Sequence, residues 1–275
     1  MLKTRIITAV VLLAVMLPVL FLLPPVYIGA FFLVAVIVGA WEWSRLLVPD
    51  APRAAWLYAT FCLVIIFLLL GLQNMAWQFS LLLLAVIFWF FIAPFLLAKG
   101  INLTLKSLRP FYVVLGLILL PATWFAIIFL RELGLVFLLS TMALVWVADI
   151  GAYFVGKAFG KHKLAAQISP GKSIEGALGG LILCYAYAFV CVFFLPFEST
   201  IFGSWAIRFG WVPMLIMVTL LTAFSVIGDL FESQLKRLAG VKDSSQLLPG
   251  HGGVLDRVDA LIPTMPIAAI LAGLV

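Results

Sequence analysis

Charged residues are scarce in this chain of 275 residues. They make up 10% of the sequence, whereas hydrophobic residues make up 66% and the mean hydropathy is +1.27. Soluble globular proteins average about 25% charged and about 45–50% apolar residues. Polar side chains are too few here to cover the surface of a water-soluble fold. The composition therefore excludes a soluble enzyme, a secreted disulfide-rich module and a disordered chain, and it indicates a polytopic membrane protein.

Cysteine is also rare, and the three cysteines, Cys62, Cys184 and Cys191, all fall in apolar runs. Cys184 and Cys191 are seven residues apart, which is about 10 Å along a helix. That separation is too long for a disulfide. We interpret all three as small apolar side chains that fill the packing.

Long apolar runs decide between a helical bundle and a barrel. A membrane barrel shows short segments of alternating polarity, and this chain instead has unbroken runs such as Leu81 to Leu97. The predicted fold class is an all-α polytopic integral membrane protein with about nine transmembrane helices. These spans cover residues 6–23, 26–47, 54–72, 76–97, 111–130, 133–155, 174–196, 211–233 and 259–275.

The positive charges predict the orientation of the spans. With the N-terminus in the cytoplasm, 15 of the 17 lysines and arginines lie on the cytoplasmic side, and only Arg131 and Arg208 lie outside. The net charge of +6 then reflects basic cytoplasmic loops facing anionic lipid, and it does not indicate a nucleic-acid partner.

The polar residues are distributed unevenly along what we predict to be a single membrane domain, 1–275. Residues 1–130 are mainly structural spans, and their one intramembrane acid is Glu42. We expect Glu42 to be solvated or paired with Arg45. Residues 131–275 hold nine of the eleven acids and both histidines, so we interpret this part as the catalytic half.

The first polar segment runs from Ser225 to Pro263. Ser225, Asp229, Glu232 and Lys236 are spaced by four, three and four residues, which places them on one face of a helix. Ionised groups at this depth in a membrane require a metal, a base or a water-filled cavity.

A second acidic pair, Asp256 and Asp259, shares a helix face at the start of the last predicted span. Two carboxylate clusters on neighbouring helix ends are suited to a hard metal. Magnesium favours a few carboxylates together with phosphate oxygens of the substrate. Nearby lysines and arginines, including Lys242 and Arg257, match the remaining charge of a polyphosphate.

A glycine-rich stretch, Leu248 to Val254, lies between these clusters, with His251 followed by Gly252 and Gly253. Exposed amides in such a turn form an anion-binding nest. The alternative is a plain tight turn between two helices.

The second polar segment runs from Ala148 to Gly180 and begins with Asp149 inside a span. Ser169-Pro170 predicts a helix start with proline at its first position. Amides at that start, together with Lys172 and Ser173, are suited to binding a phosphate. The segment is not a P-loop, because the required earlier glycine falls at Ala166.

These charged positions resemble a known signature. Ser233-Gln-Leu-Lys236-Arg237, Lys242-Asp243, His251-Gly-Gly and Asp256-Arg257-Val-Asp259 are similar to the signature of the phosphatidate cytidylyltransferases, or CDP-diacylglycerol synthases. The resemblance covers the chain in outline and is strongest from about residue 145 onward.

The resemblance implies a reaction in which CTP and phosphatidate give CDP-diacylglycerol and pyrophosphate for phospholipid synthesis. It also implies a homodimer in the inner or plasma membrane, surrounded by lipid, and a magnesium-dependent site that faces the cytoplasm. Asp229 and Asp256 match the metal-binding aspartates of the family, and Lys236, Arg237 and Lys242 match its phosphate-contacting bases. Whether a second metal ion or a monovalent ion also binds stays open.

The candidate site therefore has two groups of residues. The catalytic candidates are Asp229, Asp256, Lys236, Arg237, Lys242, Asp243 and His251. The substrate-binding candidates are Ser225, Glu232, Ser233, Lys172, Ser173, Gly252, Gly253, Arg257, Asp259 and Asp149.

Two other functions remain open. Membrane prenyltransferases also use paired acidic clusters and magnesium around a diphosphate, although they do not require the Lys-Arg, Lys-Asp and His-Gly-Gly spacing. A secondary transporter also carries intramembrane acids, but its charges gather near the midplane and its halves repeat, and neither feature is visible here.

Overall fold

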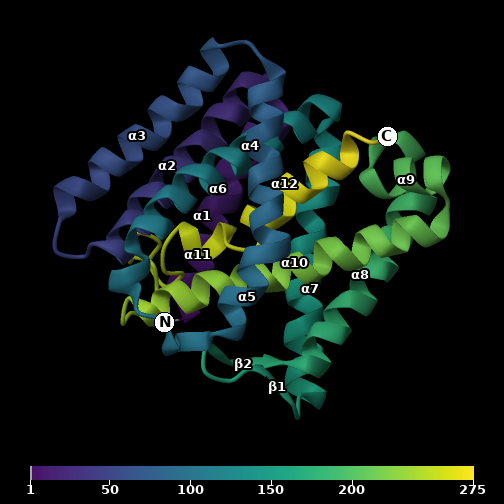
Figure 1. Ribbon diagram of the computed structural model, residues 1–275. Helices are drawn as coiled ribbons and strands as arrows, with labels where there is room; N and C mark the ends of the chain where they lie inside the picture. Colours follow the sequence, from purple (N-terminus) through teal and green to yellow (C-terminus); the bar gives the residue numbers. More distant parts are fainter. Residues whose placement is uncertain (1) are drawn as a thin grey trace.

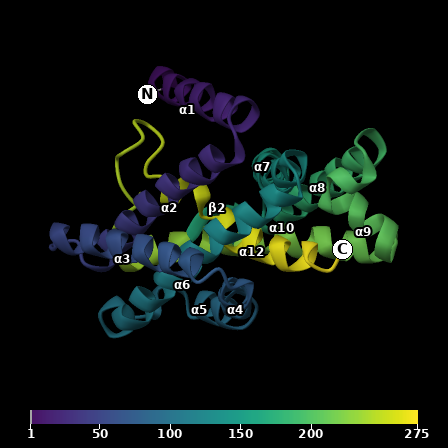
Figure 2. The same ribbon diagram turned by 90° about the horizontal axis from the view of Figure 1, so that it is seen from above.

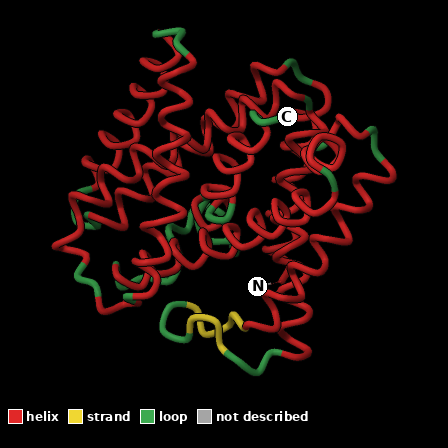
Figure 3. Tube along the Cα trace, turned by 45° about the vertical axis from the view of Figure 1, so that its right-hand side comes forward, coloured by secondary structure: helices red, strands yellow, loops and turns green. Residues whose placement is uncertain are grey.

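The computed structural model describes residues 2–275, with the side chains of residues 2–7, 9, 12 and 13 left out. The side chains of Lys3 and Arg5, which contribute to the predicted orientation, thus lie outside the described residues. Helices form most of the described chain, and the sheet among the described residues is one short two-stranded hairpin (Figure 3).

The helices follow one another along the chain, and the longest connections are those between α7 and α8 and between α10 and α11. In chain order they are α1 (Leu2–Leu22), α2 (Pro25–Leu47), α3 (Pro52–Gly71), α4 (Met75–Ile87), η1 (Phe88–Ile92), α5 (Ala93–Ala98), η2 (Gly100–Asn102), α6 (Leu105–Leu133), α7 (Leu135–Phe159), α8 (Ile174–Phe194), η3 (Phe197–Ser199), α9 (Ile201–Phe209), α10 (Trp211–Leu238), α11 (Leu255–Val258) and α12 (Leu261–Ala272). The π-helical turn η1 joins α4 to α5 without a break.

Among the described residues, seven helices are long and apolar enough to cross a membrane. They are α2, α3, the continuous α4–η1–α5, α6, α7, α8 and α10. The all-α membrane class is therefore confirmed, and the predicted count of nine spans is not. In Figure 2, α1 lies at the edge of the bundle, while α6, α10 and α12 lie within it.

The last predicted span, 259–275, contains the 12-residue helix α12. At 1.5 Å per residue this helix is about 18 Å long, which is shorter than the hydrocarbon core of about 30 Å. Nearly all of its residues are buried, and it packs against α6, α10 and α4 (Figure 1). The segment is thus an interior helix covered by protein on all sides, which explains why it is apolar all round.

The connection between α7 and α8 is a hairpin of β1 (Lys163–Ala165) and β2 (Ser169–Ser173). The predicted helix start at Ser169-Pro170 is therefore wrong. Proline is tolerated in such a short edge strand. The helix begins at Ile174 instead, where the Ser173 hydroxyl accepts the Gly176 amide at 3.1 Å and caps the first turn.

Small residues bring α7 and α8 very close together. A Cβ atom on Gly151 of α7 would lie 2.9 Å from the Cα atom of Gly180 in α8, and one on Gly180 would lie 2.7 Å from the carbonyl oxygen of Ala148. Contacts of this kind are typical of helix packing in membranes. The tight packing fixes the position of the part of α7 that carries Asp149.

The two chain ends lie at opposite ends of the bundle (Figure 1). The Thr8 hydroxyl donates a hydrogen bond to the carbonyl oxygen of Pro249 at 2.9 Å, which places the start of α1 beside the glycine-rich loop. At the other end, Arg208 donates to the carbonyl oxygen of Val275 at 3.2 Å. The glycine-rich loop and the C-terminus therefore lie at different ends of the bundle.

Candidate active site

Five carboxylates from three parts of the chain gather at the end of the bundle that holds the hairpin. Asp149 comes from α7, Asp229 and Glu232 from α10, and Asp256 and Asp259 from α11 and its C-cap. Asp229 interacts electrostatically with both Asp149 and Asp259, and Glu232 interacts with Asp256 and Asp259. The two predicted acidic clusters thus form one.

Lys236 lies between two of these carboxylates. Its ammonium group is paired with Glu232, one turn earlier on α10, and with Asp256 at 2.5 Å. Glu232 and Lys236 therefore lie on one face of α10, as their spacing predicts, and their side chains meet across one helical turn. The Lys236 side chain is only 10% exposed, so this charge is held inside the protein.

Asp256 accepts hydrogen bonds from four donors. Its Oδ1 atom accepts from Lys236, and its Oδ2 atom accepts from the Ser244 amide at 3.0 Å, the Ser244 hydroxyl at 3.0 Å and the Gly253 amide at 2.7 Å. Burial by itself raises the pKa of this carboxyl, but the hydrogen bonds from Lys236 and the two amides outweigh burial and lower the pKa below its usual value. Asp256 is therefore a carboxylate at neutral pH.

The Asp229 carboxylate is paired with a lysine of the β-hairpin. The Lys172 ammonium group on β2 lies 2.7 Å from its Oδ2 atom, and the Ser233 hydroxyl donates to its Oδ1 atom at 3.3 Å. A candidate phosphate-binding lysine and a candidate metal ligand are thus paired with each other in this structure.

The glycine-rich stretch is a tight turn. The Leu248 amide binds the Gly252 carbonyl at 2.8 Å, and the His251 amide binds the Leu248 carbonyl at 2.8 Å. Gly252 has φ +81°, where a Cβ atom would also lie 2.6 Å from the Asp256 carboxylate. Because the amides of Leu248 and His251 have partners within the loop and the Gly253 amide donates to Asp256, few amides are left for the predicted anion nest.

His251 and Arg257 are linked through the backbone. The Arg257 guanidinium donates to the His251 carbonyl oxygen at 3.0 and 2.7 Å, and it also interacts electrostatically with Asp149. The buried Nδ1 atom of His251 has no hydrogen-bond partner among the described residues. Arg257 is thus the cation that connects the loop to α7.

Some predicted site residues point elsewhere. Ser225 is buried and donates to the Thr222 carbonyl within α10. Arg237 is exposed and donates to the Ile168 carbonyl of the hairpin turn at 3.4 Å, so it supports the hairpin. Ser173 is the helix cap described above.

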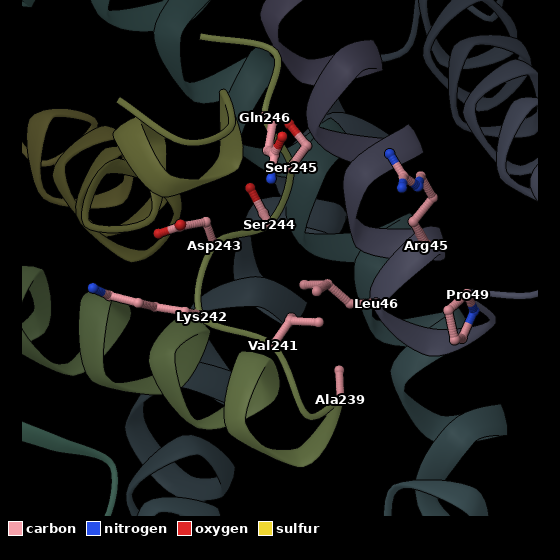
Figure 4. Close-up of a pocket in the computed structure, with 10 residues that line it drawn as sticks. All are labelled: Arg45, Leu46, Pro49, Ala239, Val241, Lys242, Asp243, Ser244, Ser245 and Gln246. Atoms are coloured by element: carbon pink, nitrogen blue, oxygen red, sulfur yellow. The ribbon is translucent and has the colours of Figure 1, made fainter. Parts of the chain in front are cut away.

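Lys242 and Asp243 border an open cavity of about 550 Å³, between the loop after α10 and the end of α2. In Figure 4 their side chains point away from Arg45 and Leu46 on the opposite wall. None of the five clustered carboxylates lines this cavity, although its volume is within the usual range for a small-molecule site.

Known proteins resemble this chain over almost its full length. The sequence profile of the cytidylyltransferase family matches residues 3–275. The chain belongs to the cytidylyltransferase family. A phosphatidate cytidylyltransferase of Pseudomonas aeruginosa is 39% identical over 273 residues, which are 98% of this chain and 97% of that protein. One of Haemophilus influenzae is 38% identical over 288 residues, covering 97% and 96%. One of Staphylococcus haemolyticus is 43% identical over 141 residues, about half of each chain.

The sequence did not indicate the role of Glu42. The expectation that this acid is solvated or paired with Arg45 is wrong, because Glu42 is fully buried and accepts hydrogen bonds from residues 244–255. Arg45 instead lies over the Trp41 ring, with its guanidinium carbon 4.6 Å from the ring centre. A lone acid in an apolar span was the only available signal, and nothing in the spacing relates it to a loop 200 residues away.

Proposed function

We propose that this member of the cytidylyltransferase family transfers a cytidylyl group from CTP to phosphatidate, giving CDP-diacylglycerol and pyrophosphate. The observation that supports this most is the single cluster of Asp149, Asp229, Glu232, Asp256 and Asp259 with its lysines, in a chain matched end to end by relatives of that name. A membrane helix bundle with a charged end suits one lipid substrate and one water-soluble substrate.

The reaction joins two anions. A phosphate oxygen of phosphatidate attacks the α-phosphorus of CTP, a new P–O bond forms, and the bond to the β-phosphate oxygen breaks as pyrophosphate leaves. The main barriers are charge repulsion and alignment. The second phosphate pKa of a phosphomonoester is about 6, so the nucleophile is already ionised near pH 7. We therefore assign no general base, and His251 is not required in that role.

The cations of the site match the substrates' charge. Lys172 and Lys236 neutralise Asp229 and Asp256 in the structure, and they are the cations closest to the carboxylates. We propose that substrate phosphates replace the carboxylates as partners of these ammonium groups. Arg257 lies nearby, and Arg237 and Lys242 lie at the exposed rim.

Magnesium is the metal that we propose for this site. Among the residues that the structure describes, no three acidic, histidine or cysteine side chains form a ready-made metal cage. Hard carboxylate oxygens nevertheless fit an ion that usually binds one or two carboxylates and completes its coordination with water and phosphate. Asp229 and Asp256 would hold it, with Asp149 and Asp259 adjacent. The bound ion would supply neutralisation of the triphosphate.

A direct assay tests this function. The chain purified in detergent and supplied with phosphatidate, labelled CTP and magnesium is expected to form CDP-diacylglycerol and pyrophosphate, and a chelator is expected to stop product formation. Parallel reactions with an isoprenyl diphosphate and acceptor test the prenyltransferase alternative. A folded, lipid-supplied sample that forms no CDP-diacylglycerol would contradict the proposal.

The same proposal includes the placement of the site in the cell. We propose that the hairpin and the glycine-rich loop face the cytoplasm of the inner or plasma membrane, where CTP is available, and that the chain acts as a homodimer in lipid. The hydrogen bond between Arg208 and Val275 supports a C-terminus on the other side of the membrane, because it joins the end of the chain to α9, away from the glycine-rich loop.

Cysteine labelling tests this topology. In a variant without the three native cysteines, Lys163→Cys in the exposed hairpin is expected to resist a membrane-impermeant maleimide in intact cells and to react after lysis. Arg208→Cys, exposed at the other end of the bundle, is the matched position and is expected to react in both samples. The reverse pattern would overturn the orientation.

A further inference from the structure

Glu42 makes a buried connection between the N-terminal half and the loop after α10. Its Oε1 atom accepts from the Ser245 hydroxyl at 2.5 Å and the Val254 amide at 3.0 Å. Its Oε2 atom accepts from the Leu255 amide at 2.6 Å and the Ser244 hydroxyl at 3.1 Å. The residue is 0% exposed, so water does not compete for these bonds.

These donors come from both ends of one loop. Ser244 and Ser245 stand at its start, and Val254 and Leu255 stand at its end, where α11 begins. The glycine-rich turn lies between them. The Glu42 carboxylate therefore joins the two ends of the loop, and it does so from α2, which packs against α11. Figure 4 shows Ser244 and Ser245 beside this helix, with the Arg45 side chain well apart from both.

The same loop residues also hold Asp256. The Ser244 amide and the Gly253 amide donate to Asp256, which in turn holds Lys236. The Ser244 hydroxyl lies within hydrogen-bond distance of both Glu42 and Asp256, and its single proton serves one of them at a time. Glu42 is thus one hydrogen-bonded residue away from the candidate catalytic carboxylate.

The packing at Gly253 shows how close these groups are. A Cβ atom at this position would collide with both the Ser244 hydroxyl and the Glu42 carboxylate. The second glycine of the His-Gly-Gly sequence is therefore required by the presence of Glu42 as well as by the turn. A buried carboxylate with this many donors costs free energy unless every bond is kept.

We infer that Glu42 is a positioning residue for cytidylyl transfer, which acts by fixing the loop Ser244–Leu255 so that Asp256 and Lys236 meet the reacting phosphates. The inference rests on the proposed function for its catalytic part. We assign Glu42 no contact with substrate, so it is not a catalytic residue.

The test compares Glu42→Gln with wild type. Glutamine has one acceptor oxygen in place of two, so its NH₂ group must face one of the loop amides that Glu42 accepts. We expect kcat to fall about 10- to 100-fold, because a shift of about 1 Å near the reacting groups has effects of this size. The KM for phosphatidate is expected to change less than about threefold, since we assign Glu42 no contact with this substrate.

Loop order is measured independently of activity by limited trypsin digestion. Lys242 and Arg257 are exposed and flank the loop. If the loop is no longer held by Glu42, trypsin is expected to cleave at these two residues at least five times faster in Glu42→Gln than in wild type. Elution from a sizing column is expected to stay close to wild type, which shows that the helix bundle is still folded. Glu198→Gln, an exposed acid in η3, is the matched control and is expected to match wild type in every measurement.

A milder variant keeps the inference testable if Glu42→Gln folds poorly. Ser245→Ala removes one donor and is expected to show a smaller loss of kcat, and the double variant is expected to lose less than the two single losses combined.

Unchanged kcat and trypsin cleavage in Glu42→Gln would overturn the inference. So would a loss of activity that follows the folded fraction while Ser245→Ala remains fully active. If wild type itself makes no CDP-diacylglycerol, the proposed function fails, and the trypsin result still decides whether Glu42 orders the loop.

Discussion

Asp256→Asn is expected to lower turnover at least 100-fold and to leave the helix bundle folded. The asparagine keeps the size of the side chain but removes the negative charge that Lys236 contacts at 2.5 Å. Its NH₂ group must also face either Lys236 or the amides of Ser244 and Gly253, all of which are donors. The displacement of these groups from the reacting phosphates accounts for the size of the effect.

The measurement is kcat for CDP-diacylglycerol formation at saturating CTP and phosphatidate, together with elution in detergent as a test of folding. Asp50→Asn is the matched control, because Asp50 is an exposed acid in the turn between α2 and α3. Near-normal turnover in Asp256→Asn would remove this residue from the site. If Asp256 also holds magnesium, the residual activity is expected to require a higher magnesium concentration for its half-maximum than wild type does.

The sequence predicted much of this site because its residues are close together along the chain. Glu232 and Lys236 are four apart on one helix, and Asp256 follows the turn that comes after it. Helical spacing brings the first pair together, and the glycine-rich turn brings the second acid back to α10. The apolar runs likewise predicted the spanning helices, since backbone hydrogen bonds in lipid leave few alternatives.

Other features depend on contacts between distant parts of the chain. Glu42 meets Ser244 and Ser245 across about 200 residues, and no local pattern encodes that contact. The predicted helix start at Ser169-Pro170 is wrong because these residues belong to β2, which pairs with β1, and Ser173 caps the helix instead. Residues 259–275 resemble a span by composition, yet α12 is apolar because protein surrounds it. Hydropathy alone does not distinguish burial in protein from burial in lipid.

Lys236→Met is expected to reduce both stability and turnover. The side chains of Lys236, Glu232 and Asp256 are 10%, 3% and 6% exposed, so the lysine is the cation between two buried carboxylates. Removing one partner of a buried ion pair typically costs about 3–5 kcal/mol, because the remaining charge stays buried without compensation. We expect the thermal midpoint in detergent to fall and CDP-diacylglycerol formation to become undetectable. Lys106→Met, an exposed lysine near the start of α6, is the control and is expected to behave as wild type.

A second substitution separates the two losses. In Glu232→Gln/Lys236→Met one of the two buried carboxylates becomes neutral, so part of the lost thermal stability is expected to return. Turnover is not expected to return, because the ammonium group proposed to contact the substrate phosphates is still missing. Recovery of turnover together with stability would show that Lys236 only stabilises the fold. Full stability in Lys236→Met itself would show that Glu232 and Asp256 do not need a buried cation between them.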